Sequence, residues 1–148
     1  MDPLKKKFHQ KATALGTEIR NLLKEKGDTK VDEVVIKQLY GGARGIKMMI
    51  WEPSQLDPIE GIRFRGFTIP ELKEKLPKTK NGKEPRPEGL FWLMLVGEVP
   101  TEEEVDWLTS QWIRRSNVPE HTFKALDALP NDAHPMTQFS TAIVSMQT

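Results

Sequence analysis

The chain has 148 residues, and its 22 lysines and arginines against 21 aspartates and glutamates leave a formal net charge of +1. This length suits one compact domain that buries a core without metal or disulfide support. The near-zero charge gives no strong field that would attract nucleic acid or an anionic membrane. Because the sequence has no cysteine, it excludes a thiol nucleophile, a cysteine-rich zinc site and disulfide bonds.

The three histidines are scattered and show none of the spacings at which histidines share a metal ion, so we expect no metal site. No apolar run approaches the roughly 18 residues of a membrane span. The first ten residues also lack the apolar core of a secretory signal. We therefore expect a soluble, intracellular protein with neither nucleic acid nor a membrane as a partner.

The first part of the chain combines a helix with irregular segments. Residues 3–26 carry apolar side chains at mostly three- and four-residue spacing, which predicts an amphipathic helix that stops at Gly27. Residues 28–45 mix β-branched residues with a glycine cluster, which indicates a short strand and a glycine-rich turn. Residues 46–52 and 61–66 flank a loop of turn residues, which predicts a β-hairpin.

From residue 68 onward the pattern is helical. Thr68 with Glu71 and Thr101 with Glu104 form two capping boxes, each of which opens a helix. Residues 87–97 are apolar nearly all round, which is typical of a buried helix. Two more helices are expected near 119–129 and 135–148, and the apolar stripe of the last one still runs where the chain ends. We therefore expect that the natural chain is longer.

These elements predict a mainly α fold with about six helices and one small β-hairpin. All 148 residues are expected to form a single unit. It would comprise an N-terminal helix within 1–30, short strands and the hairpin within 31–67, and helices within 68–148.

The glycine cluster Tyr40–Gly45 is the strongest candidate for a ligand site. Glycines let backbone N–H groups approach a ligand, and Arg44 would supply the positive fork that phosphate oxygens prefer. The cluster lacks both the Gly-Lys-Ser/Thr of a P-loop and the following helix of a dinucleotide fingerprint. A plain turn is therefore the alternative to a phosphate site.

Arg63 and Arg65 stand two positions apart in a predicted strand. Alternation places both side chains on one face. There they either bind an anion or are solvated and paired with a carboxylate such as Glu52. We favour the structural role.

His134 stands immediately before Pro135 at a predicted helix start. It either caps the helix or acts as a base, but no nucleophile assembles around it in the sequence.

We expect the lysines at 5–7 to form a solvated face. The four tryptophans, Trp51, Trp92, Trp107 and Trp112, are expected in the core.

Four stretches resemble a known family. In chain order, they are YGGARGIK, LDPIEGIRFRGFTIPEL, PEGLFWLMLVGEVPTEEEVDWL and ALPNDAHPMTQFSTAI. Together they closely resemble the N-terminal part of citrate synthase, of the type found in mitochondria and some bacteria. The resemblance extends from about residue 31 to the end of the chain and implies the all-α fold of that family.

The resemblance also implies an enzyme that condenses acetyl-coenzyme A with oxaloacetate and water, giving citrate and coenzyme A in the tricarboxylic acid cycle. Coenzyme A and its acetyl ester are then product and substrate, and no tightly bound cofactor is implied. The family's catalytic histidines and aspartate lie in segments that this sequence lacks. No catalytic residue is therefore assigned, and the 148-residue chain is expected to be inactive alone.

The resemblance implies one binding residue and one partner. Arg44 matches the arginine that helps to bind the phosphates of coenzyme A in this family. The helices near 119–129 and 135–148 match segments of a homodimer interface. A non-catalytic, self-associating module is the alternative function. For location, the cytoplasm of a bacterium is the first expectation and the mitochondrial matrix is the alternative.

Overall fold

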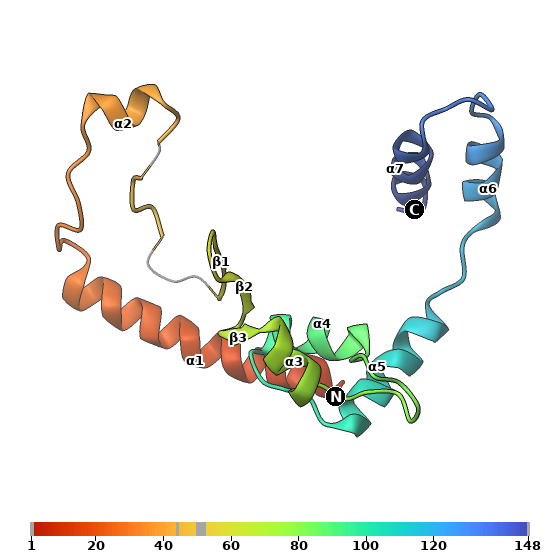
Figure 1. Ribbon diagram of the computed structural model, residues 1–148, viewed down its shortest axis with the longest axis horizontal. Coiled ribbons are helices and arrows are strands. Elements are labelled where there is room, and N and C mark those ends of the chain that lie inside the picture. Colours follow the sequence, from red (N-terminus) through yellow and green to blue (C-terminus); the bar gives the residue numbers. More distant parts are fainter. Residues whose placement is uncertain (1, 44, 50–52, 148) are drawn as a thin grey trace. The chain divides into compact units, whose positions relative to one another are not determined.

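The computed structural model describes residues 2–43, 45–49 and 53–147 (Figure 1). The described residues form helices α1 (Pro3–Lys26), α2 (Ile36–Tyr40), α3 (Ile69–Lys75), α4 (Pro87–Val96), α5 (Glu102–Arg114), α6 (Glu120–Asp127) and α7 (Pro135–Ser145), and strands β1 (Ser54–Asp57), β2 (Gly61–Phe64) and β3 (Phe67–Thr68). The strands pair as one antiparallel sheet in the order β1-β2-β3. The predicted mainly α fold is therefore confirmed, with seven helices in the described residues instead of about six.

The chain divides into two compact units, Met1–Leu108 and Thr109–Thr148, and each is described by itself. The predicted organisation as a single unit stays a prediction. None of the helices in the described parts of the chain combines the length and the apolar character needed to cross a lipid bilayer.

Helix α1 starts and ends where its local signals place it. The Asp2 carboxylate accepts a hydrogen bond from the Lys5 backbone N–H at 3.1 Å, and Pro3 occupies the first turn. Gly27 follows the last helical residue, as the sequence predicts. None of the residues of α1 is fully buried, although Leu4 packs against the core of the first unit.

The segment after α1 differs from the prediction. A short helix, α2, stands where a short strand was expected. The Gln38 side chain accepts a hydrogen bond from the Val35 backbone N–H at 2.9 Å, and this contact organises the first turn of α2. The β-branched residues of this segment favour a strand, but the hydrogen bond between Val35 and the Gln38 side chain favours a helical turn, and the helix forms.

The first strand of the hairpin lies later than predicted. Residues 46–49 are not in a strand, and β1 begins at Ser54, inside the predicted loop. The turn between β1 and β2 explains this later start. Its geometry is set by the Asp57 carboxylate, which accepts hydrogen bonds from the backbone N–H groups of Ile59 and Glu60, both at 2.8 Å. This tight turn pairs Asp57 with Gly61 and so fixes the register of the whole hairpin.

Helix α4 is central to the core of the first unit. Its Leu93 is fully buried with Leu72 and Leu76, and its Trp92 and Val96 are buried with Leu108 of α5 in a second cluster. A helix that contributes to two clusters needs apolar residues on more than one face, which explains its apolar sequence. The helix ends at Gly97, whose φ of 81° is the left-handed conformation that favours glycine.

In the second unit, α6 and α7 pack against each other. His121 Nε2 lies 2.7 Å from the Ser145 backbone oxygen. Because a carbonyl oxygen only accepts, Nε2 is the donor in this bond. Thr122 of α6 is 1% exposed, whereas none of the described residues of α7 is fully buried. The α6–α7 pair therefore has one buried residue among those described, Thr122, and its other contacts lie near the surface of the pair.

Candidate functional site

The glycine cluster forms an open, left-handed turn after α2. The backbone φ angles of Gly42, Ala43 and Gly45 are 83°, 62° and 71°. Such angles are disfavoured for an alanine, so the turn itself imposes this conformation on Ala43. A side chain built at Gly42 or Gly45 would meet no atom within 4 Å. The glycines are therefore required for the backbone conformation and leave the loop accessible to a ligand.

Arg44, the predicted phosphate-binding residue, lies outside the described residues, and its role stays a prediction. The described residues on either side of Arg44 make long backbone hydrogen bonds to residues three positions earlier. Gly42 donates to the Leu39 carbonyl at 3.2 Å, and Ile46 donates to the Ala43 carbonyl at 3.4 Å. Tyr40, which precedes the loop, is 95% exposed.

Arg63 is paired with a carboxylate, as expected, but the partner is Glu60. Its Nε donates to Glu60 Oε2 at 3.0 Å, Nη2 donates to the other carboxylate oxygen, and Nη1 donates to the Gly66 carbonyl at 2.9 Å. The hydrogen bonds with Arg63 hold the pKa of the Glu60 carboxyl below its ordinary value. Glu52, the partner considered from the sequence, lies outside the described residues.

The prediction that Arg65 lies on the same strand face as Arg63 is wrong. Strand β2 ends at Phe64, which pairs with Phe67, so Arg65 and Gly66 form a two-residue turn. Both turn residues have positive φ, 50° and 87°, as a type I′ turn requires. The turn redirects the Arg65 side chain towards α4, where its Nε and Nη2 donate to the Met94 carbonyl.

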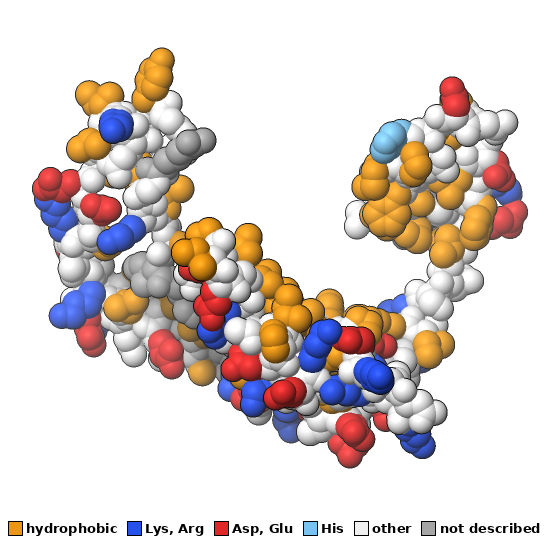
Figure 2. All heavy atoms as spheres, in the orientation of Figure 1, with side chains coloured by type: hydrophobic (Ala, Val, Ile, Leu, Met, Phe, Trp, Pro, Cys, Tyr) orange, Lys and Arg blue, Asp and Glu red, His pale blue; other side chains and the backbone are white. Residues whose placement is uncertain are grey.

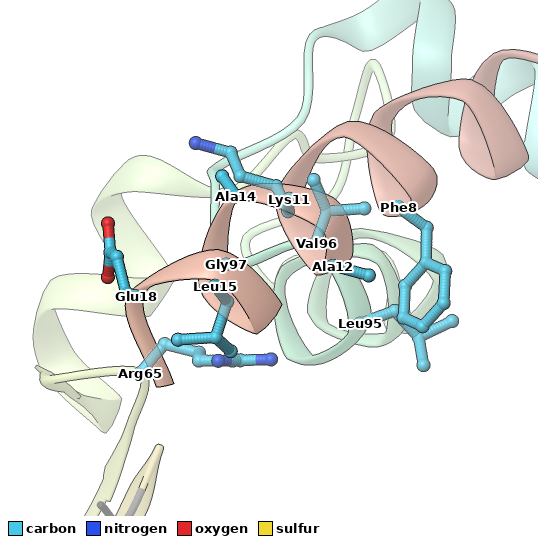
Figure 3. Close-up of a pocket in the computed structure, with 10 residues that line it drawn as sticks. All are labelled: Phe8, Lys11, Ala12, Ala14, Leu15, Glu18, Arg65, Leu95, Val96 and Gly97. Atoms are coloured by element: carbon cyan, nitrogen blue, oxygen red, sulfur yellow. The ribbon is translucent and has the colours of Figure 1, made fainter. Parts of the chain in front are cut away.

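A groove of about 570 Å³ lies between α1 and α4 (Figure 3). Its apolar walls come from Phe8 and Leu15 of α1 and from Leu95 and Val96 of α4. The ionisable side chains that line it are Lys11, Glu18 and Arg65. No histidine, serine, threonine or tyrosine of the described residues is part of the lining, so this groove resembles a binding surface more than a reaction centre.

The two histidines of the second unit make structural contacts. His134 Nδ1 accepts a hydrogen bond from the Met136 backbone N–H at 3.1 Å and so caps α7. This geometry favours the capping role over that of a base. His121 donates to the Ser145 carbonyl. Among the described residues, no group of three histidine, aspartate or glutamate side chains could hold a metal ion.

Fold and loop together define a mainly α protein with a small hairpin and an open glycine-rich turn. Residues 42–148 match the family model described as "Citrate synthase, C-terminal domain". The chain belongs to the citrate synthase family, as the four sequence stretches indicate.

The relatives support the same family over nearly the whole chain. The chain is 50% identical over 144 residues to "Citrate synthase, mitochondrial" of Saccharomyces cerevisiae, covering 97% of this chain and 30% of the yeast protein. It is 48% identical to the protein of the same name from Xiphias gladius, over 88% of this chain and 28% of that protein. It is 47% identical to "2-methylcitrate synthase, mitochondrial" of Yarrowia lipolytica, over 99% of this chain and 31% of that protein.

The chain thus spans about 30% of the length of the relatives that it matches. Its correspondence to their N-terminal part stays a prediction. The expectation of a bacterial, cytoplasmic protein is wrong, because these relatives are eukaryotic proteins named as mitochondrial. The sequence motifs resemble enzymes of both mitochondria and some bacteria, so by themselves they did not distinguish these two locations.

Proposed function

We propose that this chain is part of a mitochondrial enzyme that condenses acetyl-coenzyme A with oxaloacetate to give citrate and coenzyme A in the tricarboxylic acid cycle. The observation that carries this proposal is the 50% identity to a mitochondrial citrate synthase over 97% of the chain. The match to a 2-methylcitrate synthase favours a second candidate, in which the acyl donor carries one more carbon.

A chimera tests the proposal. In it, residues of this chain replace the matching part of the yeast relative, and the release of free thiol is measured with acetyl-coenzyme A and oxaloacetate. Turnover that depends on both substrates is the expected result. A folded chimera without turnover would contradict the proposal. Preference for the longer acyl donor would favour the second candidate.

The isolated 148-residue chain should show no turnover in the same assay. Among its described residues no group of three histidine, aspartate or glutamate side chains could hold a metal ion, and the ionisable side chains that line the groove are one lysine, one glutamate and one arginine. Binding substrate without placing an acid and a base gives little acceleration. Thiol release by the chain alone, above that of a heat-unfolded sample, would show that the chain carries a complete site.

Arg44 is proposed to bind the phosphates of coenzyme A. The open left-handed turn formed by its described neighbours supports this role, because backbone N–H groups in such a turn can approach an anion. Loss of a charged hydrogen bond costs about tenfold to a hundredfold in affinity. In the chimera, Arg44→Ala should therefore raise the KM for acetyl-coenzyme A by that factor and leave the KM for oxaloacetate unchanged.

The matched control is Arg20→Ala, which removes an exposed arginine of α1 that donates to the neighbouring Thr17. This variant should leave both KM values as they are. Equal changes in both KM values for Arg44→Ala would indicate a role in folding and would contradict phosphate binding.

A homodimer through α6 and α7 is proposed as the partner interaction. The support is a set of large apolar side chains that remain exposed on this helix pair: Phe123, Met136, Phe139, Ile143 and Val144. Figure 2 shows hydrophobic side chains gathered over α6 and α7. Apolar side chains that are exposed together on one surface favour association with a second copy of the chain.

Sedimentation of the 148-residue chain tests the dimer. We expect reversible dimers at about micromolar to tens of micromolar concentration, which a standard-sized interface reaches. Phe139→Asp with Ile143→Asp should give monomers, whereas the control pair Glu120→Gln with Lys124→Gln, which removes an exposed ion pair of α6, should still dimerise. A native chain that sediments strictly as a monomer would contradict the interface. Dimers of the chain together with an inactive, folded chimera would favour the self-associating module.

A further inference from the structure

Helix α1 is attached to α4 along part of its length. Leu4 packs against the cluster of Trp92, Val96 and Leu108, and the side chains of Phe8 and Leu15 face the groove beside α4 (Figure 3). The large apolar side chains of the last part, Ile19, Leu22 and Leu23, are 43–60% exposed, and Phe8 beside the groove is itself 48% exposed. The first part of the helix therefore covers α4 only partly, and the apolar stripe of the last part is largely in solvent.

Two lysines one helical turn apart fasten the first part of α1. Lys7 Nζ lies 2.6 Å from Glu104 Oε1 and 5.7 Å from the centre of the Trp92 ring, a distance at which a cation and an aromatic face attract each other. Lys11 pairs with Glu98, which follows the C-terminal end of α4. The hydrogen bond from Lys11 holds the pKa of the Glu98 carboxyl below its ordinary value, so that carboxylate is charged at neutral pH.

Both ion pairs are in contact with solvent, Lys11–Glu98 more than Lys7–Glu104, and are therefore sensitive to salt. The side chains of Lys7 and Lys11 are 35% and 53% exposed, and those of Glu104 and Glu98 are 15% and 46% exposed. Pairs at this level of exposure contribute about two- to fivefold each to an equilibrium, and dissolved ions screen them. Raised ionic strength thus weakens the attachment of α1 more than it weakens the buried apolar core.

The segment that follows α1, residues 28–49, makes its polar contacts locally. Hydrogen bonds and ion pairs of the described residues within 28–49 remain inside that segment or join it to the last turn of α1, for example Lys30 with Glu33, Val35 with Gln38 and Thr29 with Lys26. Among the described residues, these polar contacts do not join the segment to α4. Elements with few buried contacts are those that open independently of global unfolding.

We propose that α1 is a salt-sensitive strap. It closes over α4 while the pairs Lys7–Glu104 and Lys11–Glu98 hold, and it lifts as a unit when they are screened. Lifting removes Leu4 from the cluster of Trp92, Val96 and Leu108 and takes away the α1 wall of the groove. The strap thereby controls whether this apolar face of α4 is covered or accessible.

Amide hydrogen exchange of the 148-residue chain tests the strap, with residues 3–20 compared with residues 87–96 at about 0.05 M and about 0.5 M salt. At high salt, exchange in α1 should accelerate about fivefold, because a helix that has lost its tertiary contacts is only marginally stable in water, while exchange in α4 stays unchanged. The double variant Lys7→Gln with Lys11→Gln should exchange at the high-salt rate already at low salt. The matched control is Lys5→Gln with Lys6→Gln, on the same helix turn, where the described residues provide no ion-pair partner. It should behave as the native chain.

A charge exchange distinguishes the ion pair from a general loss of helix stability. Lys11→Glu alone should accelerate exchange in α1, and adding Glu98→Lys should restore most of the protection. Three outcomes would overturn the strap: rates in α1 that do not respond to salt, equal acceleration in α1 and α4, or a control pair that matches Lys7→Gln with Lys11→Gln.

Discussion

The guanidinium of Arg65 donates two hydrogen bonds to the backbone carbonyl of Met94, which lies 29 positions further along the chain. Met94 is in the last turn of α4, where carbonyl groups have no partner within the helix. A positive side chain at this end also interacts favourably with the helix dipole. Arg65 therefore caps α4 and joins the β2–β3 turn to the core helix of the first unit.

Two substitutions of Arg65 should distinguish the stabilisation by this cap from the cost of the positive φ at the same residue. Arg65→Ala keeps a side chain at a φ of 50° and removes the hydrogen bonds, so the free energy of unfolding should fall by about 2 kcal/mol. Arg65→Gly also removes the bonds but relieves the positive φ, and it should be about 1 kcal/mol more stable than the alanine variant. Urea denaturation measures both values. Two variants of equal stability would show that the turn does not strain this residue.

The fully buried Leu93 should be the most sensitive aliphatic position of α4. It packs with Leu72 and Leu76, and truncation would leave a cavity that the surrounding helices cannot fill. Leu93→Ala should lower the free energy of unfolding by about 2–5 kcal/mol. The control is Leu39→Ala in α2, where 60% of the side chain is exposed and the loss should stay below about 0.5 kcal/mol. Similar losses at both positions in urea denaturation would contradict the assignment of the core.

Acid should weaken the start of α3 through Glu71. The Thr68 backbone N–H and hydroxyl donate to the Glu71 carboxylate at 2.7 and 2.8 Å, and these bonds hold its pKa below the ordinary value. A lowered pKa stabilises the fold above about pH 4.3, where the unfolded carboxyl is also charged. That stabilisation is lost as the pH falls through the lowered folded-state pKa.

The variant Glu71→Gln tests this dependence, because an amide cannot be protonated in this range. Its thermal midpoint should lie below that of the native chain at neutral pH and should fall less steeply on acidification. Glu74→Gln, an exposed position of the same helix, is the control and should follow the native acid profile. If the thermal midpoints of the native chain and Glu71→Gln fall in parallel on acidification, the capping box does not cause the acid sensitivity.

Local signals made most of the helical fold predictable from the sequence. The Thr68–Glu71 pair forms the predicted capping box, and the apolar run of α4 ends at Gly97 as expected. Such features depend on residues three or four positions apart, so the sequence determines them without knowledge of the tertiary structure. The same holds for the end of α1 at Gly27.

The hairpin and the arginines were less predictable, because their positions depend on turn geometry. The carboxylate of Asp57 sets the register of β1 against β2, and the two-residue turn at Arg65 turns that side chain away from the face of Arg63. Sequence alternation alone cannot show where a strand stops. The contact between Arg65 and Met94 joins residues 29 positions apart, which no local pattern contains.

Thr122 offers a gain in stability in the second unit. Thr122 of α6 is 1% exposed, and its Oγ1 has no hydrogen-bond partner among the described residues. Such a hydroxyl is solvated when the chain unfolds and unsatisfied when it folds, which costs about 1–3 kcal/mol. Thr122→Val keeps the shape and removes the hydroxyl, so the thermal midpoint of the α6–α7 pair should rise by an amount equivalent to about 1 kcal/mol. Thr122→Ser keeps the hydroxyl and removes the methyl group, and it should lower stability by about 1 kcal/mol. A valine variant less stable than the native chain would mean that the hydroxyl is satisfied, for example by a buried water molecule.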